Sequence, residues 1–189
     1  MANPTGGFGF APVGRNGGPY NGVVERAYVA ATTVTTAIFN GDTVKMTGTA
    51  SADGYPEVTL CAATDPPWGV VVGVEAIKTN LQANNYRPAS TAAYLKVVPV
   101  RNNFFKVRLN GSALGVGAVG TTTIYVVAAG STTTGYSGIL ASATDAGTSI
   151  ADEIRIVQII DRPDNDPALA NPEVIIQWND DQTQEAVGV

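Results

Sequence analysis

Short runs rich in Val, Ile, Thr and Tyr dominate this chain, and glycine, asparagine, aspartate or proline separates each run from the next. β-Branched and aromatic residues favour strands, whereas the separating residues favour turns because they tolerate a positive φ or fix φ. No window of a dozen residues shows the apolar period of a helix. The pattern therefore predicts an all-β protein, an antiparallel β-barrel or β-sandwich, with a β-tulip-like arrangement as one form of it.

The runs and the turn residues between them predict nine strands. They are expected at residues 23–30, 43–48, 57–63, 69–78, 92–100, 103–109, 121–128, 152–160 and 173–178.

The order of apolar and polar side chains predicts how three of these strands are covered. Residues 103–109 alternate, with Phe105 on a buried face and Lys106 and Arg108 on a face in water. In 152–160 the apolar set changes parity after Ile156, which requires a bulge or a second buried face. The run at 70–72 is apolar on both parities and is typical of a strand covered on both sides.

The first 22 residues form the least regular segment, with seven glycines, three prolines and no strand or helix period. They are expected to form an extended, Gly-rich N-terminal arm without a strand of its own. The arm carries side chains suited to anchoring it, so it is predicted to order either against its own domain or against a neighbouring subunit. The candidate contact residues are Phe8, Phe10, Val13, Arg15 and Tyr20.

Charge divides the rest of the chain. Residues 145–189 hold ten acidic and two basic side chains, and the whole chain has a formal net charge of -5. We expect a β domain at 23–178 followed by an acidic tail at 179–189. An acidic balance makes nucleic acid an improbable partner, and the lack of a long apolar run predicts no membrane partner and no export signal.

The residues that usually carry catalysis are scarce. The chain has no histidine, and its one cysteine, Cys61, stands in an apolar run that suggests a buried hydrophobe. The glycines of 115–120 match a dinucleotide-binding spacing, but a β-branched run follows them where that motif needs a helix. We therefore expect no enzyme activity and no cofactor.

One acidic cluster, formed by Asp161, Asp164 and Asp166, could supply carboxylates to a hard cation. It lacks the glycine and the distal glutamate of an EF-hand loop, and Arg162 partly neutralises it. A turn held by side-chain hydrogen bonds is the favoured interpretation, so no metal site is predicted.

Several segments together resemble a family of tailed-bacteriophage head decoration, or capsid cement, proteins. The resembling pieces run in family order over nearly the whole chain: residues 1–13, 18–22, 39–45, 52–56, 69–73, 86–91 and 156–165.

The resemblance implies a structural virion protein on the outer surface of the capsid, made in the host cytoplasm. Its implied partners are the major capsid protein and further copies of itself, as a homotrimer or, in some families, a dimer. Its implied task is mechanical, because a clamp across the seam between capsomers adds surface that must be separated before the shell opens.

Two other functions stay open at this point. One is a phage tail or receptor-binding β module, although the long fibrous repeats that usually accompany such modules are absent. The other is a sugar-binding β-sandwich, which needs a row of exposed aromatic side chains; the two tryptophans, Trp68 and Trp178, are far apart in the sequence.

Overall fold

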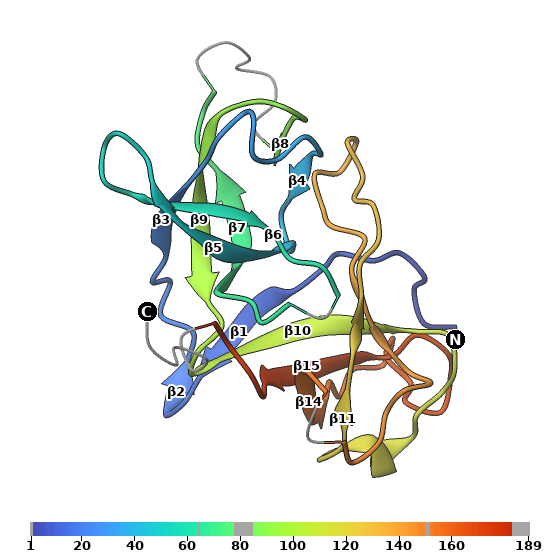
Figure 1. Ribbon diagram of the computed structural model, residues 1–189. Helices are drawn as coiled ribbons and strands as arrows, with labels where there is room; N and C mark the ends of the chain where they lie inside the picture. Colours follow the sequence, from blue (N-terminus) through green and yellow to red (C-terminus); the bar gives the residue numbers. More distant parts are fainter. Residues whose placement is uncertain (1, 64, 78–84, 150–151, 183–189) are drawn as a thin grey trace.

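A computed structural model describes residues 2–63, 65–77, 85–149 and 152–182 (Figure 1). This part of the chain forms fifteen strands and one 3-10 helix and contains no α-helix, so the predicted all-β class is confirmed. In chain order the strands are β1 (Ala11–Arg15), β2 (Gly18–Pro19), β3 (Glu25–Val29), β4 (Ile38–Phe39), β5 (Thr43–Ala50), β6 (Pro56–Leu60), β7 (Gly69–Val74), β8 (Tyr86–Arg87), β9 (Ala93–Pro99), β10 (Asn103–Asn110), β11 (Thr122–Thr123), β12 (Tyr125–Val126), β13 (Leu140–Ser142), β14 (Ile154–Ile159) and β15 (Glu173–Trp178), and the 3-10 helix η1 is Val116–Ala118.

Five strands close into a small barrel in the order β3-β6-β5-β7-β9. Four of its strand pairs are antiparallel, and the pair between β3 and β6 is parallel. Strands around a closed ring of odd number cannot alternate in direction all the way round, so one parallel pair is unavoidable. The barrel is confirmed, but the expectation of antiparallel pairing is wrong for the pair β3–β6.

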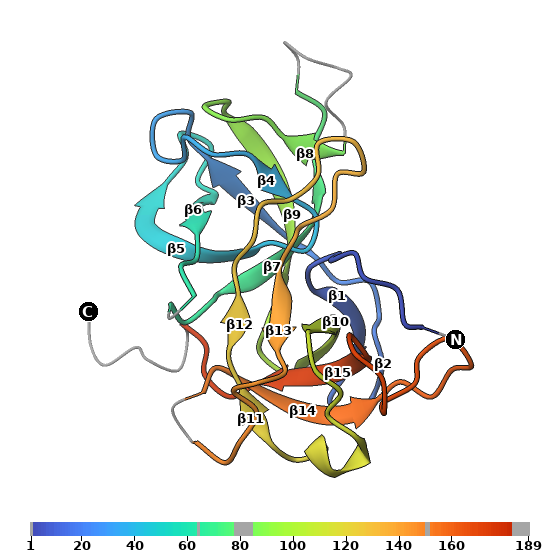
Figure 2. The same ribbon diagram turned by 90° about the vertical axis from the view of Figure 1, so that its right-hand side faces the viewer.

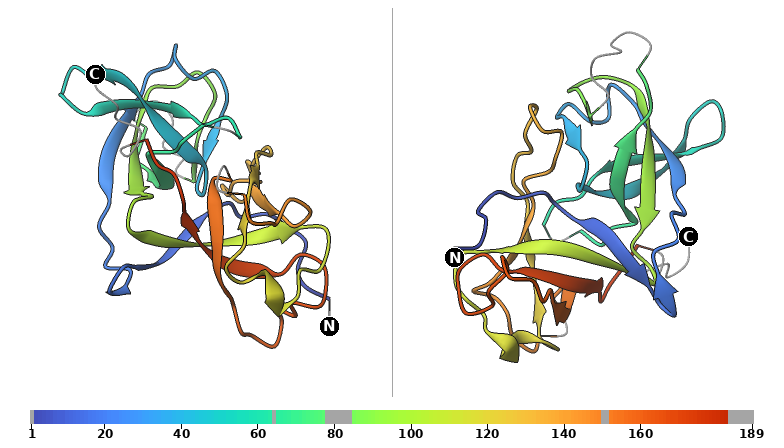
Figure 3. Two further views of the ribbon diagram at one scale, coloured as in Figure 1. Left: turned by 60° about the horizontal axis from the view of Figure 1, so that its bottom comes forward. Right: turned by 180° about the vertical axis from the view of Figure 1, so that it is seen from behind.

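A second sheet lies beside the barrel, with its strands in the order β11-β14-β15-β10-β1-β2 (Figures 1 and 3). The neighbours along this path are antiparallel. Strands β12 and β13 join it through a parallel pairing of β13 with β10. The loop between β12 and β13 extends from the sheet toward the barrel, as Figure 2 shows.

Each of the nine predicted strand ranges overlaps at least one strand, although residue 78 of the range 69–78 lies outside the described part. The range 121–128 contains two short strands, β11 and β12, instead of one long strand. Strands β4, β8 and β13 were not predicted. Each has only two or three residues, which is too short for a period of two to be visible in the sequence.

Strand β7 is covered on both sides, as predicted, because it separates two hydrophobic cores. Val71 belongs to the core inside the barrel, together with Leu95 and Val97. Val70, one residue earlier, belongs to the core between the barrel and the sheet. Both valines are fully buried, so β7 contributes to both cores, as does β9 through Val97 and Val98.

The predicted irregularity in residues 152–160 is also confirmed. The register between β14 and β15 shifts between Ile156 and Gln158, which is the position of a β-bulge. Ile154 and Ile156 are buried before it, and beyond it Gln158 is exposed while Ile159 packs against the same core.

The expectation that residues 1–22 form no strand is wrong. Residues of β1 pair with β10, and β2 pairs back onto β1, so the segment is an integral part of the second sheet. The sequence hid this strand because its partner lies about ninety residues away and β1 itself contains Pro12 and Gly14, which interrupt the usual pattern. A bulge between these two residues accommodates them.

The predicted acidic tail at 179–189 lies partly outside the described residues, which end at 182. Its first residues lie along the body of the protein. The amide of Asn179 donates to the carbonyl of Glu153 at 2.9 Å, and Gln182 exchanges side-chain hydrogen bonds with the backbone of Met46.

The turn Asn40-Gly41-Asp42 between β4 and β5 is where the arm, the barrel and the β12–β13 loop meet. The amide of Phe10 donates to the carbonyl of Gly41 at 3.0 Å, and the amide of Gly41 donates to the carbonyl of Val71 at 2.7 Å. From the loop, the amide of Ser137 donates to the carbonyl of Asn40 at 2.8 Å. This turn therefore connects three segments that are far apart in the sequence.

Gly41 permits this meeting for two reasons. Its φ is +94°, and a Cβ at this position would lie 2.5 Å from the carbonyl oxygen of Phe8 and 2.9 Å from the Cα of Gly9. Gly48 in β5 has a similar φ of +84°, but nothing lies within 4 Å of its Cβ position.

We predict that Gly41→Ala lowers the free energy of unfolding by about 3 kcal/mol or more, because left-handed strain and overpacking against the arm add. Gly48→Ala is the matched control and should cost only the strain, about 1–2 kcal/mol. Urea unfolding of both variants measures the difference. Equal losses would show that the arm does not approach Gly41 closely.

Candidate functional site

The five predicted contact residues do not form one surface. One of them is buried in the core, one covers side chains of β10, and three lie in or next to β1 and β2. Phe10 is 1% exposed and packs with Tyr125 and Trp178, at ring-centroid distances of 5.8 and 5.1 Å. It is a core residue here, so for Phe10 the arm orders against its own domain. Its hydrophobic side chain fills the space between the sheet and the barrel.

The remaining candidates are more accessible. Arg15 and Tyr20 line one groove of about 540 Å³ at the β1–β2 end of the sheet, together with Val23 and Arg101. Val13, on the same strand as Arg15, is 38% exposed. The groove brings two predicted contact residues, Arg15 and Tyr20, together on a surface that a partner could reach.

Phe8 lies apart from that groove and covers basic side chains of β10. The ammonium of Lys106 is 4.7 Å from the centroid of its ring, and the guanidinium of Arg108 is 5.2 Å away. Lys106 and Arg108 had been expected to face water. Instead Arg108 is only 7% exposed, because the arm crosses this face of the strand and the backbone carbonyl of Gly6 accepts a hydrogen bond from Arg108.

A buried carboxylate compensates these cations. Glu173 on β15 accepts from Arg108 at 2.5 Å and from Arg162 at 3.0 Å, and the ammonium of Lys106 lies 3.6 Å away. A buried ion pair is costly unless all its members are satisfied. The cluster is therefore a structural clamp that fixes the arm to β10 and β15.

We predict that Glu173→Gln lowers the free energy of unfolding by about 3–5 kcal/mol, since it leaves Arg108 buried without an anion. The control is Asp164→Asn, which removes a 54% exposed partner of Arg162 and should cost less than about 1 kcal/mol. Chemical denaturation compares them. Equal losses of unfolding free energy in the two variants would mean that the ion pairs of Glu173 do not stabilise the fold more than an exposed pair does.

Sequence reasoning missed a second anchor of the arm, Asn3. Its side-chain amide donates to the carbonyls of Asp166 and Ala170 at 2.8 and 3.0 Å, and its side-chain oxygen accepts from the amide of Asp166 at 2.8 Å. No local signal could have revealed it, because its partners lie more than 160 residues away.

The segment around Asp161, Asp164 and Asp166 folds as a turn, in agreement with the favoured interpretation. The amide of Asn165 donates to the carbonyl of Arg162 at 3.0 Å, and the side chain of Arg162 pairs with Asp164 at 3.2 Å. Asp166 accepts from the amide of Ala168 at 2.9 Å. Over the described residues, no group of three His, Cys, Asp or Glu side chains is placed to hold a metal ion.

Aromatic side chains gather in two places. Of the five strand aromatics expected in the core, Phe39, Phe105, Tyr125 and Trp178 are buried, whereas Phe104 is only half-buried. Trp68 is buried as well, so neither tryptophan offers a stacking surface. On the outside of the barrel, Tyr28, Tyr55 and Tyr94 form a partly exposed cluster. The guanidinium of Arg26 lies 3.9 Å from the centroid of the Tyr94 ring and forms a bidentate pair with Glu75.

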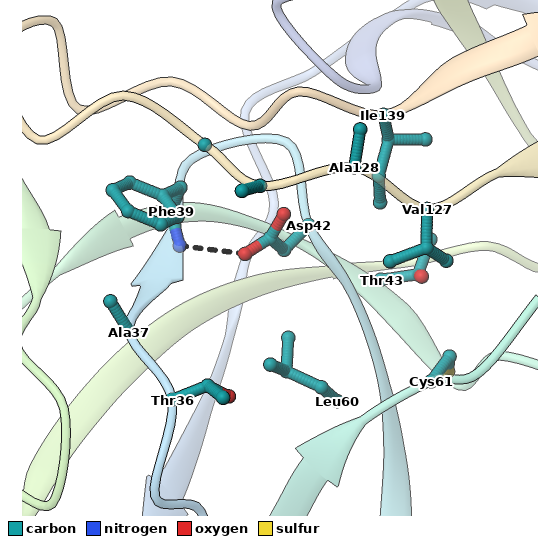
Figure 4. A pocket seen from close by; sticks show the side chains of 12 residues that line it. Thr36, Ala37, Phe39, Asp42, Thr43, Leu60, Cys61, Val127, Ala128 and Ile139 are labelled. Atoms are coloured by element: carbon teal, nitrogen blue, oxygen red, sulfur yellow. Dashed lines mark hydrogen bonds between the residues drawn. The ribbon is translucent and has the colours of Figure 1, made fainter.

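A cavity of about 470 Å³ opens between the barrel and the β12–β13 loop (Figure 4). Its floor is buried and includes Phe39, Asp42, Cys61 and Ile139, whereas its rim includes the exposed Val127. The turn formed by residues 40–42 brings Asp42 to the floor. The glycine between asparagine and aspartate is typical of a turn, but nothing in the neighbouring sequence shows that the carboxylate of Asp42 would be buried.

Asp42 is the most unusual group of the cavity. It is 6% exposed, and its side chain accepts from the amide of Phe39 at 2.8 Å. Burial raises the pKa of Asp42 to about 6, and hydrogen bonds from Ser137 and the Phe39 amide oppose the rise. Cys61 lies on the same floor, where burial raises the pKa of its thiol to about 12, so it is not a thiolate nucleophile near neutral pH.

The raised pKa predicts how stability changes with pH. Protonated Asp42 contributes stability that is fully present below pH 3.8 and is lost as pH rises through about 6. The free energy of unfolding of Asp42→Asn, relative to that of the natural protein, should therefore increase by about 2–3 kcal/mol between pH 4 and pH 7.

Asp65→Asn provides the opposite control, because the Lys45 ammonium lowers the pKa of Asp65. Ionised Asp65 stabilises the fold above its unfolded pKa, so this variant should lose stability relative to the natural protein as pH rises. Urea titrations at both pH values measure the two differences. A pH-independent difference for Asp42→Asn would contradict the burial of its carboxylate.

No protein-family model matches this chain, and a search of curated proteins gives no significant match. Among the described residues, no helix is long and apolar enough to cross a lipid bilayer.

Proposed function

We propose that this chain is a structural virion protein that decorates and cements the exterior of a phage capsid by bridging neighbouring capsid subunits. The proposal starts from the family-like sequence pieces. One observation supports it most: these pieces coincide with the elements that hold the fold together. They include the Asn40-Gly41-Asp42 turn, strand β7, and β14 with the turn that follows it.

A cement protein needs a rigid body and accessible contact surfaces. The clamp around Glu173 and the junction at Gly41 supply rigidity, since they fix the arm onto the sheet. The groove lined by Arg15 and Tyr20 supplies a surface with the residue types that dominate binding energy in protein interfaces. Several such contacts made at once convert weak binding to one capsid subunit into tight binding to a lattice.

The finer structural expectations belong to this proposal. They are a β-tulip-like barrel, assembly as a homotrimer or dimer, and a position on the outer surface of the capsid. Mass measurement in solution tests the oligomer directly, because a trimer has three times the chain mass of 19.5 kDa.

A binding experiment tests the capsid role. Heads are prepared from a deletion mutant of the phage that lacks this gene, and the purified protein is then added to them. We expect saturable binding and a higher temperature of head disruption, because bridging contacts must break before the shell opens. No binding, or binding without added head stability, would contradict the proposal.

Charge reversal tests the groove in the same assay. We predict that Arg15→Glu weakens head binding about tenfold or more, since residues that carry an interface contribute more than about 1 kcal/mol each. Arg155→Glu is the matched control, because β14 lies near the opposite edge of the sheet from β1. Equal loss in both variants would point to a general charge effect.

Sugar binding is the second candidate, favoured by the tyrosine cluster on the barrel. Tyr28 and Tyr94 line a hollow of about 360 Å³ with the carboxylate of Glu75, and aromatic rings beside a hydrogen-bond acceptor suit a pyranose. Glycan-array binding that Tyr94→Ala abolishes would support it. For a tail or receptor-binding module, in contrast, electron microscopy of particles should find the protein on the tail and not on the head.

A further inference from the structure

We propose that the cavity of Figure 4 receives a lysine side chain from a partner protein, with the ammonium against Asp42 and the aliphatic stem against the apolar walls. The identity of the partner rests on the proposed function and is a neighbouring subunit of the head. The chemistry of the cavity stands on its own geometry.

The shape of the cavity fits a side chain that enters from outside. Val127, at the rim, is 48% exposed, while Ile139 on the floor is buried. The volume of about 470 Å³ lies within the range of small-ligand sites. Leu60, Val127 and Ile139 provide apolar walls against which a stem of four methylene groups can lie.

The charge of the cavity selects the end of that side chain. Asp42 takes part in none of the ion pairs found among the described residues, unlike Glu173, which has three cationic neighbours. A carboxylate buried without a cation is costly, and a protein reduces the cost by protonating it. An incoming ammonium supplies the missing counter-charge.

The hydrogen bonds of Asp42 favour lysine over arginine. Asp42 already accepts hydrogen bonds from the amide of Phe39, at 2.8 Å to Oδ2, and from the side chain of Ser137, so its two oxygens are not both free for the parallel bonds of a guanidinium. An ammonium is a compact point charge that needs only one of them.

Binding of this kind depends on pH, because Asp42 must ionise. Among the described residues, the other titratable groups near the cavity are Cys61 on its floor, Tyr125 and the Lys45–Asp65 pair beside Cys61, Tyr86 stacked on Phe39, and Tyr136 on the β12–β13 loop. The guanidinium of Arg87 on β8 donates to the backbone carbonyl of Thr36, which also lines the cavity. Strand β7, which packs behind the turn, presents Val71 there. Burial raises the pKa of the Asp42 carboxyl to about 6, which lies between pH 5 and pH 7.5.

Methyl NMR on the full chain tests the site without heads, so its failure is distinguishable from failure of the proposed function. The probe is Nα-acetyl-lysine N-methylamide, and the comparison is the norleucine analogue, which has the stem without the ammonium. We expect saturable shifts of the Leu60, Val127 and Ile139 methyl signals, and at least tenfold weaker binding of the norleucine analogue. Affinity for the lysine probe should rise from pH 5 to pH 7.5.

Two variants complete the test. Asp42→Asn should weaken binding of the lysine probe at least tenfold, whereas Asp65→Asn, which removes the carboxylate beyond Cys61, should leave it unchanged. Val127→Phe should block the entrance without disturbing the buried floor, because Val127 is exposed.

Three results would overturn the proposal: no shifts at these methyl groups, equal binding of the norleucine analogue, or binding that Asp42→Asn does not change. Binding of n-pentylamine more than tenfold tighter than the lysine probe would assign the cavity to a free amine and overturn the partner assignment.

Discussion

The arrangement of this protein depends on close backbone contact at one turn, Asn40-Gly41-Asp42. The arm reaches the turn through Phe10, the barrel through Val71, and the β12–β13 loop through Ser137. The backbones approach this closely only because residue 41 is glycine; a Cβ there would collide with the backbones of Phe8 and Gly9. Once the turn is formed, Phe10 is committed to the core between the barrel and the sheet, and the N-terminal segment is a structural strand.

The same packing buries two carboxylates and treats them differently. Glu173 is surrounded by Lys106, Arg108 and Arg162, so its charge stabilises the clamp that fixes the arm to β10 and β15. Asp42 forms no ion pair within the described part of the chain, and burial beside the cavity raises its pKa. Compensated charge thus serves the fold, while the uncompensated carboxylate is available to an external cation.

The sequence predicts those features that depend on neighbouring residues. Alternation placed Phe105 on a buried face, the change of parity after Ile156 located the bulge, and the apolar run at 70–72 identified the strand shared by two cores. Sequence-based prediction failed for features that depend on contacts between distant segments. Strand β1, the anchor Asn3 and the covering of Arg108 by the arm depend on partners roughly 90 to 165 residues away, and neither composition nor periodicity records such partners.

The proposed role joins these features: a rigid body fixed by the junction and the clamp, with accessible surfaces at the β1–β2 groove and the cavity. The proposed role implies that a phage encodes the chain, and electron cryomicroscopy of complete particles of that phage tests the role most directly. We expect density for the barrel and its sheet on the outer face of the head, lying across the boundaries between capsid subunits. Density confined to the tail, or an outer shell without the chain, would contradict it.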